Sequence, residues 1–529
     1  MSVFGFKTYQ PAMGALIIAA FSIISRLLGV VRDRLLAGTF GAGSVLDAYY
    51  AAFKIPDFIF NTFVLGAIAS AFIPIFIGLK KQSSAEAWRL TSTIINLLVA
   101  VLLVCAVLGI IFASSLIPLI APGFDVVTTV LAIKLTRLML VAIIFFGASN
   151  VLGCVLQAEH KFLPYAIAPV LYNIGILLGI WWLVPYWGPT GLAGGVIAGS
   201  ILHLLIQFPA VRNLGYRWRL GINFTHTAVK QVIKLIIPRT IGLAASSINN
   251  IIMASFISRL GVGSLAAFTL AANLQSFPIN VFGVSLAIAI FPLFSETLVN
   301  GQKTEFTKHF SASVRRILFY IIPIAVLLLI LRAQVVRVIL GSGAFNWSDT
   351  IRTAQILGYL SLALIPDSLV PLISRVFYAL TDTRTPVLIS LTSIAVNLLL
   401  LVVLWPFGLM GVGLAYVAAS SLNLLLLITI LSRKVPDLGA KNIITGTKYM
   451  VVAALAAGSA TYLTLQWLAR LVDMHTFLGI FIQGLTAGLA GLAIYAALCA
   501  YWQLPEVNFI RTYWNSLKKM LFKYEIGKN

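Results

Sequence analysis

Long apolar stretches alternate with short polar loops along almost the whole chain. A helix needs about 20 mainly apolar residues to cross the hydrocarbon layer of a bilayer. The pattern therefore predicts an all-α, multi-pass membrane protein with about fourteen transmembrane helices. The predicted spans are residues 12–34, 45–78, 88–116, 129–156, 163–184, 190–211, 231–258, 264–298, 310–331, 352–380, 385–405, 409–431, 447–469 and 477–501.

The second, eighth and tenth of these spans are longer than a straight crossing requires, and each contains prolines. A bent or broken helix is tolerated at membrane depth where it is buried in protein or lines a water-filled cavity. We therefore expect these three spans to be interrupted beside a polar cavity. The prolines are Pro56, Pro74, Pro278, Pro292, Pro366 and Pro371.

Composition excludes a soluble domain. Hydrophobic residues make up 60% of the 529 residues, charged residues make up 10%, and the mean hydropathy is +1.01. The three cysteines, Cys105, Cys154 and Cys499, each lie in an apolar segment, so they indicate neither a disulfide framework nor a metal site.

The sequence carries no motif for catalysis. It contains no Walker-type glycine loop with its lysine, no paired carboxylates in loops and no Ser/His/Asp grouping. His203 and His309 have no metal-ligand spacing around them. We therefore expect a protein that is not an enzyme and that holds no cofactor or metal.

The basic residues orient the helices. Most of the 37 Lys and Arg residues fall in short loops on the side that holds the amino terminus, as the positive-inside rule requires of the cytoplasmic side. Both termini are therefore expected in the cytoplasm. The net charge of +22 is spread over many loops, so we do not expect nucleic-acid binding. The basic tail after Trp502 is expected to lie on anionic headgroups.

An internal repeat organises the chain. Three short segments recur in order at offsets of 217 to 220 residues. Because the repeat contains six spans, an even number, the two halves should have the same orientation and be related by an axis along the membrane normal. The matching segments are residues 41–44 with 261–264, 72–76 with 290–294, and 168–171 with 385–388.

This repeat predicts two lobes and an appendage. Residues 1–220 form an N-lobe of spans one to six, and residues 221–435 form a C-lobe of spans seven to twelve. Residues 436–529 hold spans thirteen and fourteen, which have no counterpart, and the basic cytoplasmic tail. A substrate path between the two lobes is expected, by pseudo-two-fold symmetry.

Arg26 is the first sign of a polar interior. The chain is free of charge from Thr8 to Ser25, so the first span can hardly be completed without Arg26. A charge at membrane depth costs at least about 2.5–3.5 kcal/mol and usually faces a water-filled cavity or a partner. The alternative is that Arg26 extends to the headgroups.

A polar stripe marks the second span. Its members recur at spacings of 3, 4, 3 and 4, which places them on one helix face. Lys54 and Asp57 are close enough in sequence to pair, which would make their burial less costly. We expect the stripe to face a cavity, although a structural polar seam between helices remains the alternative. Its members are Asp47, Tyr50, Lys54, Asp57 and Asn61.

The repeat places a second stripe in span eight, without charge. An offset of 219 aligns Tyr50 with Thr269, Lys54 with Asn273, Asp57 with Ser276, and Asn61 with Asn280. The cavity should therefore be asymmetric, with a charged first lobe. Three cations are then expected to form a pocket for an anionic group such as a phosphate, namely Arg26, Arg32 and Lys54.

Four further charged residues each allow two interpretations. Asp33 and Asp47 lie where an outer gate would close by pairing with arginines, although ordinary solvation near the headgroups explains them equally well. Lys134 and Arg137 are either cavity residues or residues that reach the headgroups. Glycines repeat at every fourth position and should let helices pack closely; they are Gly191, Gly195, Gly199, Gly484 and Gly488.

Several motifs together resemble the MurJ (MviN) family of lipid II flippases, within the superfamily of multidrug and oligosaccharidyl-lipid exporters. The resemblance covers spans one to twelve, and the family's two extra helices account for the last two. The motifs are residues 25–29 (SRLLG), 32–33 (RD), 40–43 (FGAG), 47–48 (DA), 52–56 (AFKIP), 135–137 (LTR), 238–240 (PRT), 277–278 (FP), 377–379 (FYA) and 382–386 (DTRTP).

The resemblance implies a fourteen-helix, monomeric transporter of the bacterial inner membrane with a central cationic cavity. Its implied substrate is lipid II, the undecaprenyl-pyrophosphate-linked peptidoglycan precursor, which moves from the inner to the outer leaflet. Arg26 and Arg32 match two cavity arginines of the family, and Asp33 and Asp47 match residues linked with its outer gate. The last two helices match a groove thought to hold the lipid tail.

The sequence departs from the family where the cavity is concerned. The family usually has cavity arginines at the positions of Phe60 and Asn273, and often an acidic residue at the position of Leu65. Two alternatives therefore stay open: a paralogous exporter of another polyprenyl-linked oligosaccharide, similar to Wzx, and a small-molecule antiporter of the same fold.

Overall fold

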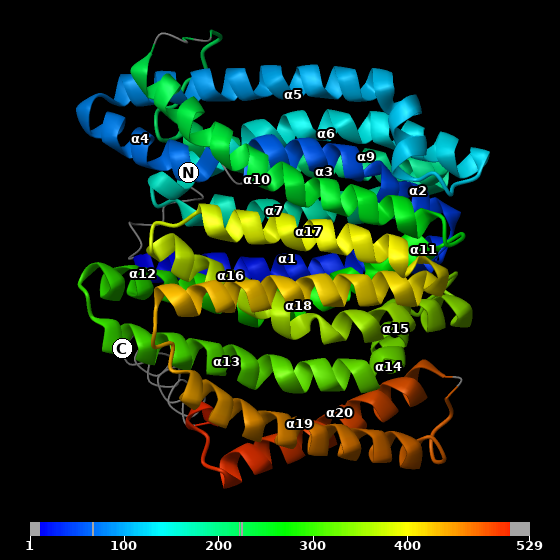
Figure 1. The fold of residues 1–529 in the computed structure, drawn as a ribbon. Coiled ribbons are helices and arrows are strands. Elements are labelled where there is room, and N and C mark those ends of the chain that lie inside the picture. Colours follow the sequence, from blue (N-terminus) through cyan, green and yellow to red (C-terminus); the bar gives the residue numbers. More distant parts are fainter. Residues whose placement is uncertain (1–10, 66–67, 222, 224–225, 475, 508–529) are drawn as a thin grey trace, which may run out of the picture. The chain divides into compact units, whose positions relative to one another are not determined.

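The computed structural model describes residues 11–65, 68–221, 223, 226–474 and 476–507, and within these ranges every regular element is helical (Figure 1). Most of the predicted basic tail lies outside the described residues. The α-helices are α1 (Pro11–Phe40), α2 (Ser44–Ala52), α3 (Lys54–Phe60), α4 (Ile68–Gln82), α5 (Ser84–Ile120), α6 (Val126–Ala158), α7 (Phe162–Leu178), α8 (Val184–Trp187), α9 (Gly191–Arg212), α10 (Thr227–Ser258), α11 (Ser264–Pro278), α12 (Ser285–Val299), α13 (Lys303–Ile330), α14 (Arg332–Leu340), α15 (Trp347–Leu362), α16 (Leu364–Ala379), α17 (Arg384–Val403), α18 (Gly408–Lys434), α19 (Ala440–Leu468) and α20 (Phe477–Tyr501). Short π-helical or 3₁₀ turns join some of them: η1 (Asn61–Leu65), η2 (Gly179–Leu183), η3 (Gly188–Thr190), η4 (Ile279–Val284) and η5 (Trp405–Phe407).

The all-α membrane class is confirmed. Each of the predicted spans falls on a helix or on an interrupted run of helices. In the described part of the chain, nine helical ranges are long and apolar enough to cross a membrane, or ten with the bent pair of α15 and α16. One of the nine, Phe162–Arg212, contains both α7 and α9. The number fourteen stays a prediction.

The three proline-containing spans are interrupted, as predicted. In span two, the helix breaks at Phe53, between α2 and α3. Pro56 lacks the N–H that would bond the carbonyl of Ala52, and Thr136 of α6 places its hydroxyl oxygen 3.5 Å from that carbonyl oxygen. The π-helical turn η4 follows Pro278 in span eight, and α15 and α16 in span ten meet at a bend of 44°.

The chain divides into two compact units by its internal contacts. The first unit holds Met1–Thr269 and Ser342–Asp349, and the second holds Leu270–Gly341 and Thr350–Asn529. The lobe boundaries at residues 220 and 435 stay predictions.

Glycine faces bring helices together in the first unit. A Cβ atom at Gly175 would lie 2.2 Å from the Cα of Gly199, and one at Gly179 would lie 2.5 Å from the Cα of Gly195. The contact partner on α9 moves from residue 199 to residue 195 as the position moves from 175 to 179. The segment of α7 and η2 therefore runs antiparallel to α9. The close approach predicted for Gly195 and Gly199 is thus confirmed, since no side chain fits between these backbones.

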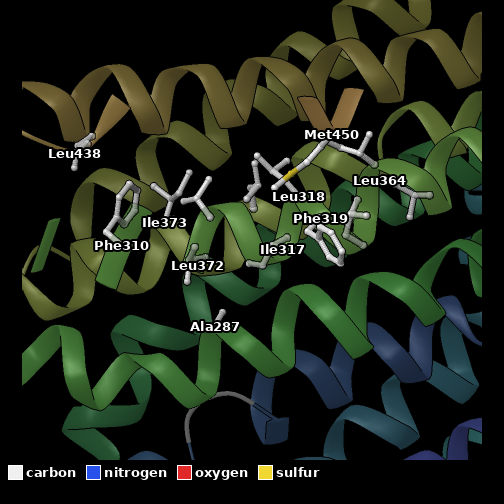
Figure 2. Packing of buried hydrophobic residues seen from close by; sticks show 14 of the residues in the cluster. Ala287, Phe310, Ile317, Leu318, Phe319, Leu364, Leu372, Ile373, Leu438 and Met450 are labelled. Carbon is white, nitrogen blue, oxygen red and sulfur yellow. The ribbon is translucent and has the colours of Figure 1, made fainter. Parts of the chain in front are cut away.

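The second unit is organised around a large apolar cluster on α13, α16 and α19 (Figure 2). Ile317 and Leu318 of α13, Leu372 of α16 and Met450 of α19 are almost completely buried there. Interhelical packing of this kind holds membrane helices together, because lipid gives no hydrophobic drive for their association. Gly484 of α20 meets Gln334 of α14, where an added Cβ would lie 3.1 Å from that residue's Cβ.

The two repeats share unusual backbone features. The π-helical turns η1 and η4 begin 218 residues apart, at Asn61 and Ile279. The loops after α1 and α10 each contain a glycine with positive φ, Gly41 at 64° and Gly261 at 104°. His160 and Thr381, which are not glycines, also share positive φ values of 56° and 59°. The internal repeat therefore extends to the backbone conformation.

Candidate substrate cavity

A cavity of about 540 Å³ lies inside the first unit. Its wall is formed by side chains of α1, α3, α6, α7 and α9. α1 contributes Ile18, Ser22, Ser25 and Arg26, whose spacing of three to four residues places them on one helix face. The opposite walls are mainly apolar and aromatic, which is typical of a ligand cavity with few polar groups that fix orientation.

Two charged side chains line this cavity among the described residues, Arg26 and Asp57. Arg26 is half-buried, and Asp57 is exposed toward the space that it lines. A guanidinium group inside a membrane is tolerated where it meets a cavity that admits water. The prediction that Arg26 faces a cavity is therefore consistent with its place in the wall.

The break after α2 separates the members of the predicted stripe. Lys54 is half-buried at the start of α3 and is not part of the wall, and Asp47 and Tyr50 of α2 are buried. Asn61 is half-buried in η1. Within the described residues, no ion pair of 4.0 Å or less joins Lys54 to Asp57. The helix is interrupted at Phe53, whose backbone stays in the right-handed helical region, and the prediction that the stripe forms one face stays a prediction.

Arg32 is held by two neighbours rather than by the cavity wall. Its Nη2 and Nε atoms lie 2.8 and 3.0 Å from Oδ1 of Asp33, which is 6% exposed. Its Nη1 donates to Oδ1 of Asn173 at 3.4 Å, and Nδ2 of Asn173 donates to the carbonyl of Ser25 at 3.2 Å. Asp33 thus pairs with its neighbour Arg32 on the same helix, and Asn173 links this pair to α7; its role in a gate stays a prediction.

Asp47 stabilises the beginning of another helix. Its carboxylate, 2% exposed, accepts hydrogen bonds from the backbone N–H groups of Gly263 at 2.5 Å and Ala266 at 2.7 Å. Gly263 precedes α11, whose first N–H groups have no partner within the helix. The negative charge of Asp47 also interacts favourably with the positive end of the helix dipole.

A second carboxylate holds the equivalent loop of the other repeat. Asp349 accepts a hydrogen bond from the backbone N–H of Ala42 at 3.2 Å. Five residues before Asp349, the backbone N–H of Ala344 donates to the carbonyl of Gly38 at 2.7 Å. The loops 41–43 and 261–263 are the repeat pair recognised in the sequence. Each is therefore fixed by one buried carboxylate.

The remaining predicted residues lie away from the cavity wall. Lys134 and Arg137 of α6 are exposed, and Arg137 donates to the carbonyl of Ile110 on α5 at 3.1 Å. Asn273 and Ser276 are half-buried in the part of α11 that belongs to the second unit. Ser276 donates to the carbonyl of Asn273 at 2.8 Å, so this hydroxyl is satisfied within its own helix.

The structure adds polar cavity residues that the sequence analysis did not select. Ser149 of α6 lies 2.7 Å from Nδ1 of His203 on α9, and Nε2 of Gln207 donates to Ser149 at 2.9 Å. All three line the cavity. The available signal was the spacing of four between His203 and Gln207 in an apolar span, which puts both on one face.

Ion pairs at the loops are a separate feature. Lys80 pairs with Glu159 at 2.6 Å and lies 4.6 Å from the ring centroid of Trp88. Asp382 pairs with Lys434 and accepts from Thr385 N at 3.0 Å. Burial opposes the charge on Asp382, but the hydrogen bonds from Lys434 and Thr385 lower its pKa to about 2.

The comparison with known families decides the identity. A family model described as lipid II flippase MurJ matches residues 36–482, which is most of the chain. The chain belongs to the MurJ family. The resemblance found in the sequence motifs is confirmed, and the chain is a member of a family of flippases.

Members of the MurJ family from several bacteria are similar over most of their length. The probable lipid II flippase MurJ of Thermotoga maritima is 33% identical over 407 residues, which cover 75% of this chain and 81% of that protein. The corresponding protein of Synechocystis is 28% identical over 545 residues, covering 98% of this chain and 100% of that protein.

Solved structures support the MurJ fold. A structure titled "Lipid II flippase MurJ, inward closed conformation" has a TM-score of 0.77 and 25% identity, and covers 92% of this chain and 98% of that chain. An inward-facing multidrug transporter of the MATE family has a TM-score of 0.66 at 13% identity, covering 80% and 99%. The second likeness shows the fold alone.

Proposed function

We propose that this protein is a lipid II flippase, which moves the undecaprenyl-pyrophosphate-linked peptidoglycan precursor from the inner to the outer leaflet of the bacterial inner membrane. The observation that carries the proposal is an arginine, Arg26, in the wall of a membrane cavity of about 540 Å³ in a member of the MurJ family. A pyrophosphate needs a cation inside the bilayer, and Arg26 together with the polar side chains Ser149, His203 and Gln207 of the wall supports this proposal.

Arg26 is proposed as the main contact of the pyrophosphate, because a guanidinium group binds phosphate oxygens with several N–H donors. Arg32, Lys54 and Asn273 are proposed as further substrate contacts in other states of the transport cycle. Arg32 would first have to exchange Asp33 for the substrate, since the two now lie 2.8 Å apart. A more distant supporting role remains for Tyr50, Asp57, Asn61, Lys134, Arg137 and Ser276.

Asp33 and Asp47 are proposed as parts of the outer gate. Both are buried, and Asp47 fixes the loop before α11 through two backbone N–H groups. Release of these bonds would free that loop, and their formation would hold it, which is the behaviour needed for alternating access. Relatives of this fold in the MATE family have been solved in inward-facing and outward-facing conformations.

The proposed architecture has an N-lobe of residues 1–220, a C-lobe of residues 221–435 and an appendage of residues 436–529. Both termini are proposed to be cytoplasmic, in agreement with the positive-inside rule. α19 and α20, which pack along each other, are proposed to hold the polyprenyl tail in lipid (Figure 1). A monomer carries the whole path, and neither catalysis nor nucleic acid is part of the proposal.

Complementation tests the function. A bacterium depleted of its own lipid II flippase should grow when this protein is expressed, and it should not grow with Arg26→Ala at equal membrane levels. Arg26→Lys keeps a positive charge and should restore growth in part. Full growth with Arg26→Ala would show that this cavity is not the path. If the unaltered protein is correctly inserted and still does not support growth, export of another polyprenyl-linked glycan is favoured. The presence of Phe60 in the wall, where the family usually has an arginine, is consistent with that alternative.

A further inference from the structure

A carboxylate lies at the centre of a bent span in the second unit. α15 and α16 contain 16 residues each and meet at Ala363, and Asp367 lies in the first turn of α16. Asp367 is therefore only one helical turn from the middle of this span. An ionisable residue at that depth is costly, and such residues mark ion pathways or proton relays more often than structural sites.

Three uncharged groups from two other helices surround this carboxylate. Nε2 of Gln275 on α11 and the hydroxyl of Tyr416 on α18 donate to Oδ2 at 3.1 and 3.0 Å. Ser420, one turn beyond Tyr416 on α18, contacts Oδ1 through its hydroxyl. All four residues belong to the second unit.

The two oxygens of Asp367 have different environments. Nε2 of Gln275 lies between two acceptors, Oδ2 of Asp367 and the carbonyl oxygen of Leu360 at 2.9 Å, so this nitrogen is fixed as a donor. Oδ2 therefore receives two donors. In the described part of the chain, the one hydrogen-bond partner of Oδ1 is the hydroxyl of Ser420, and a hydroxyl can either donate or accept.

This asymmetry allows two protonation states without an unsatisfied group. In the charged state, Ser420 donates to Oδ1. In the neutral state, a proton on Oδ1 is donated to the oxygen of Ser420, while Oδ2 keeps both of its donors. Buried polar groups are stable only with hydrogen-bond partners, and here both carboxyl oxygens have them in either state.

The surroundings contain no fixed charge that would neutralise Asp367. Among the described residues, no Lys, Arg or His nitrogen lies within 4.0 Å of its carboxylate, and the one titratable side chain that contacts it is Tyr416. The other helices packed against α16, which are α12, α13 and α17, contribute no charged side chain at that distance. Arg375, two turns along α16, donates to the carbonyl of Pro371 instead.

We propose that Asp367 is a proton-binding site that couples proton movement to the flippase cycle, with Ser420 as the partner of the exchanged proton. One O–H bond forms at Oδ1 with a proton from hydronium on one side of the membrane, and the same bond breaks when the proton returns to water on the other side. Asp367 is partly exposed, and the proposal requires that its exposed side meet water. This inference rests on the proposed transport function, because it assigns that function a source of energy.

A purely structural role makes a different prediction. The carboxylate would then remain charged at all physiological pH values, as an acceptor at the positive end of α16. Asn in its place would keep most of the hydrogen bonds and would have no effect on transport. The two roles can therefore be separated by experiment.

The first test needs no substrate. Infrared spectra of the purified full-length protein in detergent are recorded over a range of pH, and the carbonyl band of a protonated carboxyl group is followed. We expect a band that disappears in Asp367→Asn. Ser420→Ala should shift this band to higher frequency, since a hydrogen bond is lost, and Ser420→Thr should leave it in place. A spectrum of Asp367→Asn identical to that of the unaltered protein over the whole pH range would overturn the proposal.

The second test uses transport in proteoliposomes that contain a fluorescent lipid II analogue. A pH gradient should change the initial rate of flipping by the unaltered protein, and Asp367→Asn should lose this dependence while it still inserts and melts normally. Tyr416→Phe leaves Oδ1 and Ser420 unchanged and should retain the dependence. Equal responses of the unaltered protein and Asp367→Asn to the gradient would overturn proton coupling here. Absence of flipping by the unaltered protein would instead reject the proposed function, and the infrared result would stand by itself.

Discussion

Span two and its repeat counterpart, span eight, share a backbone but differ in chemistry. Both contain a π-helical turn at equivalent positions, η1 in the first and η4 in the second. Span two carries Asp47, Lys54 and Asp57, where span eight has Ala266, Asn273 and Ser276. The difference shows that the interruption belongs to the repeated architecture, whereas the charges belong to one half only.

The surroundings of Asp47 and Asp57 explain why span two can hold these two charges. Asp57 faces a cavity and Asp47 receives two backbone N–H groups, so neither is buried without compensation. In span eight, Ser276 and Asn280 bond carbonyls of their own helix, at 2.8 and 2.7 Å. These neutral groups need neither a cavity nor a partner from another helix. The asymmetry read from the sequence thus has a structural cause.

The largest expected difference between the halves concerns transport. Arg26→Ala should lower the initial rate of lipid II flipping about 10- to 100-fold, because a charge-assisted hydrogen bond is worth about 1.5–3 kcal/mol. Asn273→Ala, in the second stripe, should lower it by less than about 10-fold, since a neutral hydrogen bond contributes about 0.5–1.5 kcal/mol. The initial flipping rates of both variants in proteoliposomes are the measurement. Equal losses of rate would contradict the prediction that the first half binds the substrate more strongly than the second.

The next effect is on helix packing. Gly175→Ser adds a side chain to the face of α7 that meets α9. Its Cβ would lie 2.2 Å from the Cα of Gly199, so we expect a loss of about 1–3 kcal/mol in unfolding free energy. Ser393→Gly on α17, the helix of the second repeat that corresponds to α7, is the control, and it should cost about 1 kcal/mol or less in the helix. Unfolding in detergent measures both, and a stable Gly175→Ser variant would contradict the close contact of α7 and α9.

A smaller effect is expected at the start of α11. Asp47→Ala makes this position identical to its counterpart Ala266 and removes two acceptors from backbone N–H groups. The expected loss is about 0.5–2 kcal/mol, and Asp47→Asn should recover part of it because an amide oxygen also accepts. The apparent melting temperature in detergent is the measurement, with Asp125→Ala at the start of α6 as a comparison. No change for Asp47→Ala would mean that the contact does not stabilise the folded protein.

The smallest effect concerns the loop ion pairs. The lowered pKa of Asp382 means that its stabilising contribution is complete above the unfolded value of about 3.9 and is lost as the pH falls toward about 2. Asp382→Asn should therefore lower the unfolding free energy at pH 7 by about 0.2–1 kcal/mol, seen as a slightly lower melting temperature. This difference from the unaltered protein should vanish near pH 2. Glu159→Gln provides the corresponding comparison in the first repeat. A difference that grows on acidification would contradict this assignment.

Much of the fold was predictable from the sequence. Apolar periodicity located the long helices, and prolines marked the three interrupted spans, but the short helix α14 (Arg332–Leu340) lies outside every predicted span. The break in span two follows from Pro56, which has no N–H for the carbonyl of Ala52, but the sequence could not show that Thr136 of α6 lies beside that carbonyl. That contact brings together residues 84 positions apart.

The cavity was predictable only in part. Arg26 was selected because a charge interrupted an apolar span, and it does line the cavity. Lys54 was grouped with it by helical spacing, and it lies at the start of α3, outside the cavity wall. His203 and Gln207 were missed because their meaning depends on the partner Ser149 from another helix. Spacing along one helix cannot reveal a contact between helices.

The most direct test of the account is chemical capture of the substrate inside the cavity. A photoreactive benzoylphenylalanine at position 60 replaces Phe60, which lines the cavity, and a second variant carries it at position 112, where Phe112 is 52% exposed on α5. Illumination of cells should link lipid II to position 60, less or not at all to position 112, and Arg26→Ala should remove the link at position 60. Equal capture at both positions, or capture at position 60 that does not depend on Arg26, would contradict the claim that this cavity holds the lipid headgroup.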